Sequence, residues 1–388
     1  MRIALLTKEW SPQIYGGAGV HVDYLVPALA AHIAVDVHAF GERFSDAKAH
    51  PVPEFLRGAN PALETLGVNL DMVKAIAQDQ VDLVHSHTWY TNFAGQNAAL
   101  LLDIPLVITA HSLEPLRPWK QDQLGGGYRV SSWVEKNAYE NAAAVIAVSA
   151  GMKADVLSCY PNIDPEKVHV IHNGINTNIY RPDPSFEAVN KYGINSQAPY
   201  SLFVGRITRQ KGLAHLLQAA KSFDPDIQIV LCASAPDTPE IAAEVHALVG
   251  ELRDLRGKDN VMWIQEQVPR PELISLLTHA SVFTCPSIYE PQGIVNLEAM
   301  ACETAVVASD VGGIPEVVVD GETGVLVHYD QFDPASFEVN FAKAVNRVVA
   351  DSELANQFGV AGRKRAIEDF AWDSIAQSTI DVYRSVIR

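Results

Sequence analysis

Cysteine and long apolar runs are both scarce in this chain of 388 residues. Its four cysteines include no C-x-x-C pair, which gives a cysteine-bound metal little support and favours buried thiols in a reducing compartment. No apolar run approaches the roughly 18 residues of a membrane-spanning helix, and the run after Met1 is too short for a signal peptide. These absences predict a cytoplasmic protein without a membrane partner.

Positive charge is also scarce. Lysine and arginine number 29 against 46 aspartates and glutamates, which gives a formal net charge of −17 at pH 7. This balance argues against nucleic acid as a partner, because phosphate backbones are bound by basic surfaces. A small anionic ligand fits the sequence only where basic residues cluster locally.

Short apolar segments alternate with helical ones along the whole chain, which is typical of parallel strands covered by helices on both faces. The strands expected in the first half are 2–7, 34–39, 81–85, 106–110, 143–148 and 168–172. Those expected in the second half are 200–204, 227–232, 261–264, 282–285, 305–308 and 324–327. The pattern predicts an α/β protein of two Rossmann-like parallel-sheet domains, 1–175 and 176–370. Ligands of such sheets gather at the carboxyl ends of the strands, and a cleft between the domains is the expected site.

A glycine-bearing loop, 15–19, joins the first strand to a helix expected over 20–31. It is similar to the dinucleotide fingerprint G-x-G-x-x-G, but reading from Gly17 the third glycine is replaced by Val22. On this pattern alone, a tight turn and a loop that contacts a diphosphate or sugar are equally good interpretations.

Basic residues do cluster in the loop 205–212, which follows the first strand of the second domain. Arg206, Arg209 and Lys211 lie there between two glycines. A guanidinium offers a fork of donors and an ammonium a point charge, so this loop could clamp a diphosphate. The alternative is a solvated charged turn.

Two carboxylates, Glu290 and Glu298, flank a Pro-x-Gly turn that leads into a helix, with Glu298 expected two turns into that helix. Glycine at 293 lets the backbone approach a ligand closely. The amides of Gly293, Ile294 and Val295 lie at the expected helix start, where unpaired N–H groups favour an anion such as phosphate. Both carboxylates could accept hydrogen bonds from sugar hydroxyls.

Three histidines, His85, His87 and His111, lie at the ends of expected strands of the first domain. No cysteine or carboxylate spacing supports zinc at these positions, and a structural role is favoured for His85 and His87. His111 begins a loop that is expected to face the cleft, where it could hydrogen-bond a substrate hydroxyl or a backbone carbonyl.

Together these residues resemble a known family. Glu290 and Glu298 match the E-x7-E signature of retaining glycosyltransferases of the GT-B fold, and the likeness extends along nearly the whole chain. The other residues that carry it, in the family's order, are Gly16, Gly17, His111, Gly205, Arg206, Lys211 and Gly212. The opening segments 7–12 and 15–22 are similar, more narrowly, to the compact actinobacterial ADP-glucose transferases of the glycogen pathway.

The resemblance implies a donor site made largely by the second domain. Arg206 and Lys211 would hold the diphosphate together with the helix start at 293–295. Glu298 would hold the ribose hydroxyls and Glu290 the hydroxyls of the transferred glucose. The implied donor-site residues are Gly16, Gly17, Asn173, Arg206, Lys211, Glu290, Gly293, Ile294, Val295 and Glu298, and the implied catalytic residues are His111, Arg206, Lys211 and Glu290.

The implied reaction is transfer of glucose, with retention, from ADP-glucose or UDP-glucose to form an α-1,4 linkage in the glycogen or α-glucan pathway. The acceptor is an α-glucan end or a sugar phosphate, glucose 1-phosphate, which would give maltose 1-phosphate. Ile14 and Thr88 replace the lysine of K-x-G-G and the aspartate of H-x-H-D-W in ordinary bacterial glycogen synthases, on the side where the acceptor binds.

The resemblance also implies that no cofactor and no metal are needed, because two cations and a helix start neutralise the diphosphate. The terminal helix, within 371–388, is expected to cross back to the first domain. Two other functions stay open: a nucleotide-sugar 2-epimerase of the same fold, and a non-enzymatic nucleotide-sugar-binding sensor. The oligomeric state is open as well, with a homodimer as one alternative.

Overall fold

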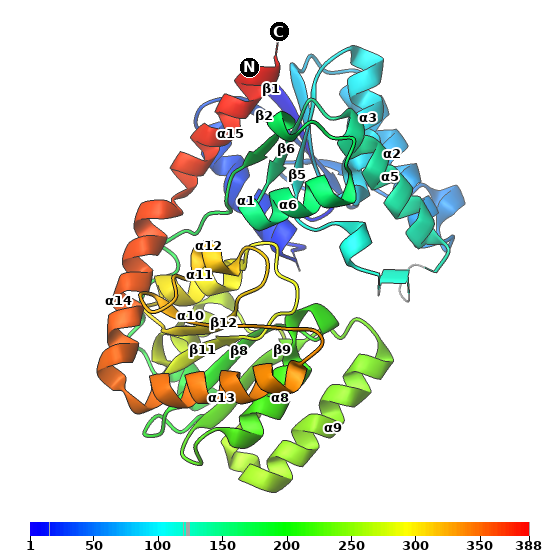
Figure 1. Cartoon of the computed structure of the whole chain (residues 1–388). Helices are drawn as coiled ribbons and strands as arrows, with labels where there is room; N and C mark the ends of the chain where they lie inside the picture. The colour runs from blue at the N-terminus through cyan, green and yellow to red at the C-terminus, as the bar shows by residue number, and fades with distance from the viewer. Residues whose placement is uncertain (15, 119, 122–124, 388) are drawn as a thin grey trace. The chain divides into compact units, whose positions relative to one another are not determined.

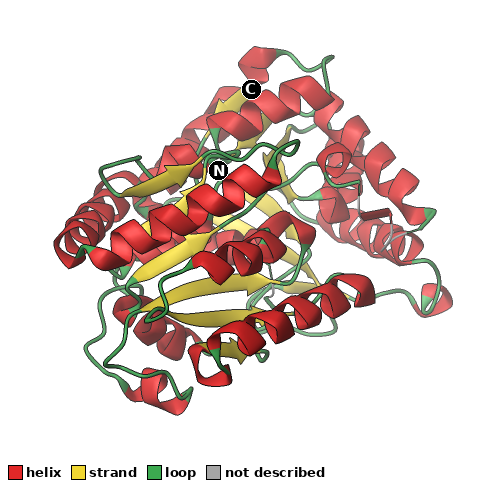
Figure 2. Ribbon diagram, turned by 60° about the horizontal axis from the view of Figure 1, so that its bottom comes forward, coloured by secondary structure: helices red, strands yellow, loops and turns green. Residues whose placement is uncertain are grey.

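The chain forms two compact units (Figure 1). The N-terminal unit comprises Met1–Gly174 and Trp372–Arg388, and the C-terminal unit comprises Ile175–Ala371. The computed structural model describes residues 1–14, 16–118, 120–121 and 125–387, so Tyr15 of the first glycine loop lies outside the described residues. Helices cover both faces of a sheet in each unit, which confirms the predicted α/β fold of two Rossmann-like domains (Figure 2).

The sheet of the N-terminal unit is parallel throughout and runs in the order β3-β2-β1-β4-β5-β6-β7. Its strands are β1 (Arg2–Thr7), β2 (Ala34–Phe40), β3 (Lys48–His50), β4 (Leu83–His87), β5 (Leu106–Ala110), β6 (Ala144–Ala147) and β7 (Val168–Val170). Its α-helices are α1 (Gly17–Ala30), α2 (Pro61–Ile76), α3 (Trp89–Leu102), α5 (Gly127–Asn141), α6 (Ala150–Cys159) and α15 (Trp372–Val386).

The first strand shows why this sequence forms a sheet with two helical covers. Ile3 and Leu5 pack into the core that α1 and α15 complete, whereas Ala4 and Leu6 pack into the core that α2, α3 and α5 complete. Successive residues of a strand point to opposite faces, so a continuous apolar run is buried on both sides. Each large apolar side chain buried in this way contributes about 1.5–3 kcal/mol.

The sheet of the C-terminal unit is also parallel and runs in the order β10-β9-β8-β11-β12-β13. Its strands are β8 (Tyr200–Arg206), β9 (Gln228–Ser234), β10 (Val261–Ile264), β11 (Val282–Cys285), β12 (Val306–Ser309) and β13 (Gly324–Val327). Its α-helices are α7 (Glu187–Lys191), α8 (Leu213–Ala219), α9 (Pro239–Arg256), α10 (Arg270–His279), α11 (Ile294–Ala301), α12 (Ile314–Val317), α13 (Pro334–Ala350) and α14 (Ser352–Asp369).

Both sheets reverse their strand order beside their first strand. In the N-terminal unit β1 lies between β2 and β4, and in the C-terminal unit β8 lies between β9 and β11. Ligands of open α/β sheets bind beyond the carboxyl ends of the strands at such a reversal. The loops that follow β1 and β4, and those that follow β8 and β11, are therefore the places where a site is expected within each unit.

Several expected boundaries were wrong by two or three residues. The strand expected at 81–85 is β4, Leu83–His87, so His85 lies in the middle of the strand and not at its end. Strand β8 continues to Arg206, because the main chain pairs with β9 as far as that residue. Helix α1 begins at Gly17 and not at residue 20. Strand ends depend on pairing with neighbours, which the local pattern does not contain.

The terminal helix α15 belongs to the N-terminal unit, whereas the preceding helix α14 belongs to the C-terminal unit. Ile380 and Tyr383 of α15 are fully buried in the core that also contains Leu25 of α1. Among the helices of the described ranges, none combines the length and the apolar character that spanning a bilayer requires.

Candidate functional site

Three histidines meet where the strands of the N-terminal unit reverse their order. His21 comes from α1, His87 is the last residue of β4, and His111 follows β5 directly. His87 Nδ1 lies 2.9 Å from His111 Nε2, within hydrogen-bond distance. The His21 ring stands edge-on to that of His111, with 4.7 Å between the ring centroids. The sequence predicted His111 here, but it did not predict His21.

Burial keeps these imidazoles neutral. Desolvation lowers the pKa of His21 to about 4, although a hydrogen bond with Asn173 opposes the shift. Desolvation also lowers the pKa of His87 and of His111 well below the ordinary value of 6.5, and the neighbouring histidines lower both further. At neutral pH the cluster therefore offers uncharged ring nitrogens that can donate, accept or bind a metal.

His85 has a different environment from the other histidines. Its Nδ1 lies 2.6 Å from the hydroxyl of Tyr383 in α15, and its Nε2 lies 2.7 Å from the hydroxyl of Thr109 in β5. Both ring nitrogens are thus used to join β4 to its neighbours. This arrangement agrees with the structural role expected for His85, whereas His87 belongs to the cluster.

The first glycine loop is held by a carboxylate. The amide of Gly16 donates to Oε2 of Glu9 at 2.8 Å, so this donor is already engaged inside the protein. A Cβ at Gly19 would lie 2.5 Å from the same oxygen. The close approach that requires glycine is therefore at Gly19, whereas Gly17 begins α1. The sequence singled out Gly16 and Gly17 but gave no sign of Glu9.

In the C-terminal unit, the basic loop and the first carboxylate of the paired glutamates are in contact. Lys211 Nζ donates to Oε2 of Glu290 at 2.6 Å, and the Ser287 hydroxyl donates to the same oxygen at 3.1 Å. The Glu290 side chain is 8% exposed and that of Lys211 is 22% exposed. Burial is the largest single influence and lowers the pKa of Lys211, but attraction by Glu290 and Cys285 and the hydrogen bond to Glu290 together outweigh it, so the pKa is raised and the lysine stays charged.

Close packing fixes this contact. Gly212 lies in the left-handed region at φ +64°, and a Cβ there would lie only 1.9 Å from the carbonyl oxygen of Pro286. The amide of Ile288 donates to the carbonyl of Gln210 at 2.9 Å. The loop after β8 therefore lies directly against the loop after β11, as the reversal of strand order predicts.

Arg206, at the carboxyl end of β8, forms a second ion pair. Its Nη1 lies 3.2 Å from Oδ1 of Asp237, whose side chain is 7% exposed, while the Arg206 side chain remains 35% exposed. The sequence predicted the arginine but not its carboxylate partner. Asp237 orients the guanidinium and leaves part of it accessible for an anion.

The turn before α11 also has the predicted form. Gly293 has φ +94°, and α11 begins at Ile294, so the amides of residues 293–295 lie at a helix start, where N–H groups lack partners within the helix. The carbonyl of Glu290 accepts from the amide of Gly313 at 3.0 Å. A Cβ at Gly312 would lie 2.0 Å from that carbonyl oxygen. The turn at 312–313, which the sequence analysis missed, thus supports the backbone of Glu290.

Glu298 is the fifth residue of α11, one turn into the helix and not two as expected. Burial raises the pKa of its carboxyl, and this shift is opposed by a hydrogen bond with Tyr180 and by attraction to Arg270. Neither partner was predicted. The charge of Lys211, which pairs with Glu290, also opposes the shift at Glu298, so this lysine acts on both carboxyls.

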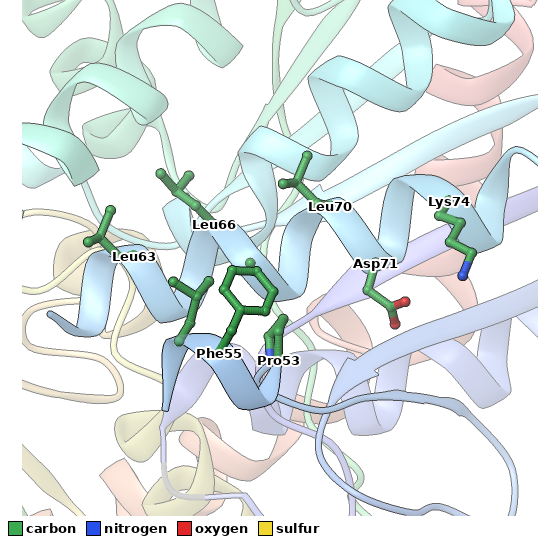
Figure 3. A pocket seen from close by; sticks show the side chains of 9 residues that line it. Pro53, Phe55, Leu63, Leu66, Leu70, Asp71 and Lys74 are labelled. Atoms are coloured by element: carbon green, nitrogen blue, oxygen red, sulfur yellow. The ribbon is translucent and has the colours of Figure 1, made fainter. Parts of the chain in front are cut away.

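An apolar depression of about 410 Å³ lies elsewhere in the N-terminal unit, between α2 and a 3₁₀ turn at Glu54–Leu56 (Figure 3). Phe55 and Leu70 line it and are 84% and 59% exposed. Asp71 and Lys74 are the polar residues of its lining, and Asp71 Oδ2 lies 2.8 Å from His50 Nδ1. None of the predicted site residues lines this depression.

Each unit matches the sequence model of a known family. The model described as Glycosyltransferase Family 4 matches residues 15–179, and the model described as Glycosyl transferases group 1 matches residues 185–365. The chain belongs to the glycosyltransferases of the GT-B fold and is a nucleotide-sugar-dependent hexosyltransferase. The resemblance seen in the sequence is thereby confirmed.

The chain is 55% identical to alpha-maltose-1-phosphate synthase of Mycolicibacterium smegmatis over 390 residues, which cover 100% of each chain. Among solved structures, sucrose-phosphate synthase from Thermosynechococcus elongatus aligns with a TM-score of 0.81 and 26% identity, covering 99% of this chain and 98% of the other. Anabaena HepE in complex with UDP and glucose aligns with a TM-score of 0.80 and 20% identity, covering 99% and 100%. The last likeness supports the fold alone.

Proposed function

We propose that this enzyme transfers glucose, with retention, from ADP-glucose to the 4-hydroxyl of glucose 1-phosphate, giving maltose 1-phosphate. The observation that carries the proposal is the full-length identity of 55% with an alpha-maltose-1-phosphate synthase. UDP-glucose as donor and the end of an α-1,4-glucan as acceptor are the alternatives. The buried contact between Lys211 and Glu290 supports a site for a phosphorylated sugar. It places a cation, which can bind phosphate, beside a carboxylate, which can accept hydrogen bonds from sugar hydroxyls.

The donor diphosphate would bind to the exposed part of Arg206, to Lys211 and to the first amides of α11. Charge develops on the leaving phosphate as the bond between glucose C1 and the phosphate oxygen breaks. Two fixed cations and a helix start are suited to stabilise that charge, because they are oriented before the reaction begins. These groups would lower the energy of the transition state.

Retention follows if the acceptor attacks from the face that the phosphate leaves. The acceptor oxygen forms its bond to glucose C1, the C1–phosphate bond breaks, and the departing diphosphate takes the hydroxyl proton. No enzyme nucleophile takes part in this step. Glu290 would accept hydrogen bonds from the glucose hydroxyls, and the charge of Lys211 holds the Glu290 carboxylate in place.

The remaining predicted residues would position the donor. Glu298 would bind the ribose hydroxyls, which is compatible with its place in α11 next to Tyr180. Asn173 and the backbone of His111 would contact the transferred sugar, as would the loop at Gly16 and Gly17. Because the Gly16 amide donates to Glu9, contact through this loop would have to use other groups or displace that bond.

An activity matrix tests the proposal. ADP-glucose and UDP-glucose are each incubated with glucose 1-phosphate, with glycogen, or alone, and nucleotide release is measured together with the sugar product. We expect rapid ADP release only with ADP-glucose and glucose 1-phosphate together. Conversion of the donor sugar without acceptor would indicate an epimerase, and tight donor binding without release under any condition would indicate a sensor.

A further inference from the structure

The histidine cluster of the N-terminal unit has a feature that sugar transfer does not explain. His21, His87 and His111 can each offer one ring nitrogen such that the three nitrogens lie within 4.8 Å of one another. Within the described ranges, no other three His, Cys, Asp or Glu side chains converge in this way. The three come from separate elements of one unit, α1, β4 and the residue after β5.

Nitrogens of this cluster are buried without a hydrogen-bond partner, and the Nε2 of His87 is among them. His87 is 1% exposed and uses Nδ1 in its contact with His111, while its Nε2 has no hydrogen-bond partner. Buried polar atoms are nearly always satisfied, and an exception indicates an ion or water that completes the site. The orphaned nitrogen is therefore an observation independent of the clustering.

The spacing fits a tetrahedral metal. Zinc–nitrogen bonds of about 2.0–2.1 Å place ligand nitrogens about 3.3 Å apart. The three nitrogens already lie within 4.8 Å of one another, so modest rotations of the rings bring them to this distance. Asn173 interacts with the His21 side chain and raises its pKa, and metal-bound histidines usually receive such support from a second residue.

The chemistry of the three ligand side chains determines which metal ions fit the site. Three imidazoles without a carboxylate favour zinc, cobalt, nickel or copper over magnesium and calcium. Imidazole binds metal in its neutral form. His111 is half-buried, so water can occupy a fourth position.

We propose that His21, His87 and His111 bind one divalent transition-metal ion, with Zn²⁺ as the best fit, and that the bound ion inhibits the enzyme. The inhibitory part rests on the proposed function, because a metal would hold the residue proposed to contact the transferred sugar, His111. The metal site itself does not depend on that function.

Metal uptake tests the site directly. The full chain is stripped with a chelator, titrated with Co²⁺ or Zn²⁺, and its metal content and Co²⁺ absorption spectrum are measured. We expect one ion per chain and a spectrum typical of a four-coordinate site. His21→Gln and His87→Gln should each weaken uptake at least tenfold, with the melting temperature of each metal-free variant confirming that it folds.

His328→Gln is the matched control, because His328 pairs with Asp310 in the C-terminal unit and its side chain is 80% exposed. Uptake by this variant should equal that of the unsubstituted chain. Substoichiometric uptake by the unsubstituted chain, or equal uptake by all variants, would overturn the site. If one of the two cluster variants fails to fold, the other carries the comparison.

Inhibition is measured separately. Zn²⁺ should reduce sugar transfer over the concentration range in which it binds, EDTA should restore activity, and His21→Gln should require at least tenfold more Zn²⁺ for the same inhibition. Full uptake with undiminished transfer would overturn the inhibitory role. Absence of transfer by the metal-free enzyme would contradict the proposed function, whereas the uptake result would still decide the metal site.

Discussion

Lys211 Nζ lies 2.6 Å from Oε2 of Glu290, so the residue proposed to hold the donor's phosphate is joined to the residue proposed to hold its sugar. The two residues are far apart in the chain and meet because the loops after β8 and β11 lie side by side. A diphosphate bound to Lys211 would therefore change the electrostatic environment of the Glu290 carboxylate. If the two residues have these proposed roles, phosphate binding and sugar orientation are coupled.

Removing the lysine should affect stability and activity differently. Lys211→Met leaves the buried Glu290 carboxylate without its cation, which costs about 3–5 kcal/mol for a buried pair. The double variant Lys211→Met/Glu290→Gln removes the unpaired charge, so most of the lost stability should return. Denaturant unfolding of both variants measures this difference.

In both variants, kcat should be at least tenfold below that of the unsubstituted chain, which corresponds to about 1.4 kcal/mol of activation free energy. Arg209→Ala is the control, since Arg209 lies exposed on the same loop. It should change kcat by less than twofold or threefold. Near-normal kcat in a folded Lys211→Met variant would contradict the proposed role of Lys211 in binding the diphosphate.

Substitution of Glu298 should act on the donor alone. Glu298→Ala is expected to raise the donor KM by about tenfold or more, because a pair of ribose hydrogen bonds is lost, with little change in the acceptor KM. Tyr180→Phe, which removes the hydroxyl next to Glu298, should have a smaller effect in the same direction. An unchanged donor KM in Glu298→Ala would show that this carboxylate does not hold the ribose.

Gly212→Ala should destabilise the C-terminal unit strongly. Gly212 has φ +64°, and a Cβ there would meet the carbonyl oxygen of Pro286 at 1.9 Å. Gly193→Ala is a matched control, because Gly193 has φ +70° with nothing within 4 Å of the new Cβ. The control should lose about 1–2 kcal/mol from the left-handed backbone alone. Thermal unfolding measures the stability of both variants. Equal losses of stability would show that the loop does not need the close contact between Gly212 and the Pro286 carbonyl.

Glu135 should make stability depend on pH. Burial raises the pKa of its carboxyl above the ordinary value of 4.5, and the neighbouring Glu114 raises it further. The folded chain then keeps a proton that the unfolded chain releases, so this residue lowers stability progressively as pH rises above about 4.5. Glu135→Gln should be more stable than the unsubstituted chain at about pH 8, and this advantage should shrink towards pH 5.

In Glu135→Gln, the side-chain carbonyl of the glutamine would still accept the hydrogen bonds that Oε1 of Glu135 now receives from Tyr160 and from the amide of Glu114. Glu140→Gln, on the exposed side of the same helix α5, is the control and should show no such dependence. Melting temperatures across this pH range check both variants. If the difference in melting temperature between Glu135→Gln and the unsubstituted chain is the same at every pH, Glu135 is ionised in the folded chain.

The fold was predictable from the sequence because buried parallel strands are almost continuously apolar. The runs at 106–110, 261–264, 282–285 and 324–327 gave their strands without error. The boundary at His85 failed because a polar residue inside β4 is satisfied by Tyr383 and Thr109. Such partners are distant in sequence and cannot be read from the local pattern.

The candidate site was predictable only in part, for the same reason. Arg206, Lys211 and Glu290 stand out as charged residues beside glycines, which local sequence shows. Asp237 and Tyr180 do not, because their roles depend on contacts made by the folded sheet. His21, Glu9 and Gly312 were missed likewise: each acts through a contact with a residue from another element.

The product formed from ADP-glucose and glucose 1-phosphate tests the central proposal most directly. Proton NMR of the purified reaction mixture identifies both the linkage and the anomeric configuration of the new bond. We predict maltose 1-phosphate with an α-1,4 linkage, formed in an amount equal to the ADP released. A β-linked disaccharide, free glucose as the main product, or no consumption of glucose 1-phosphate would contradict the proposed reaction.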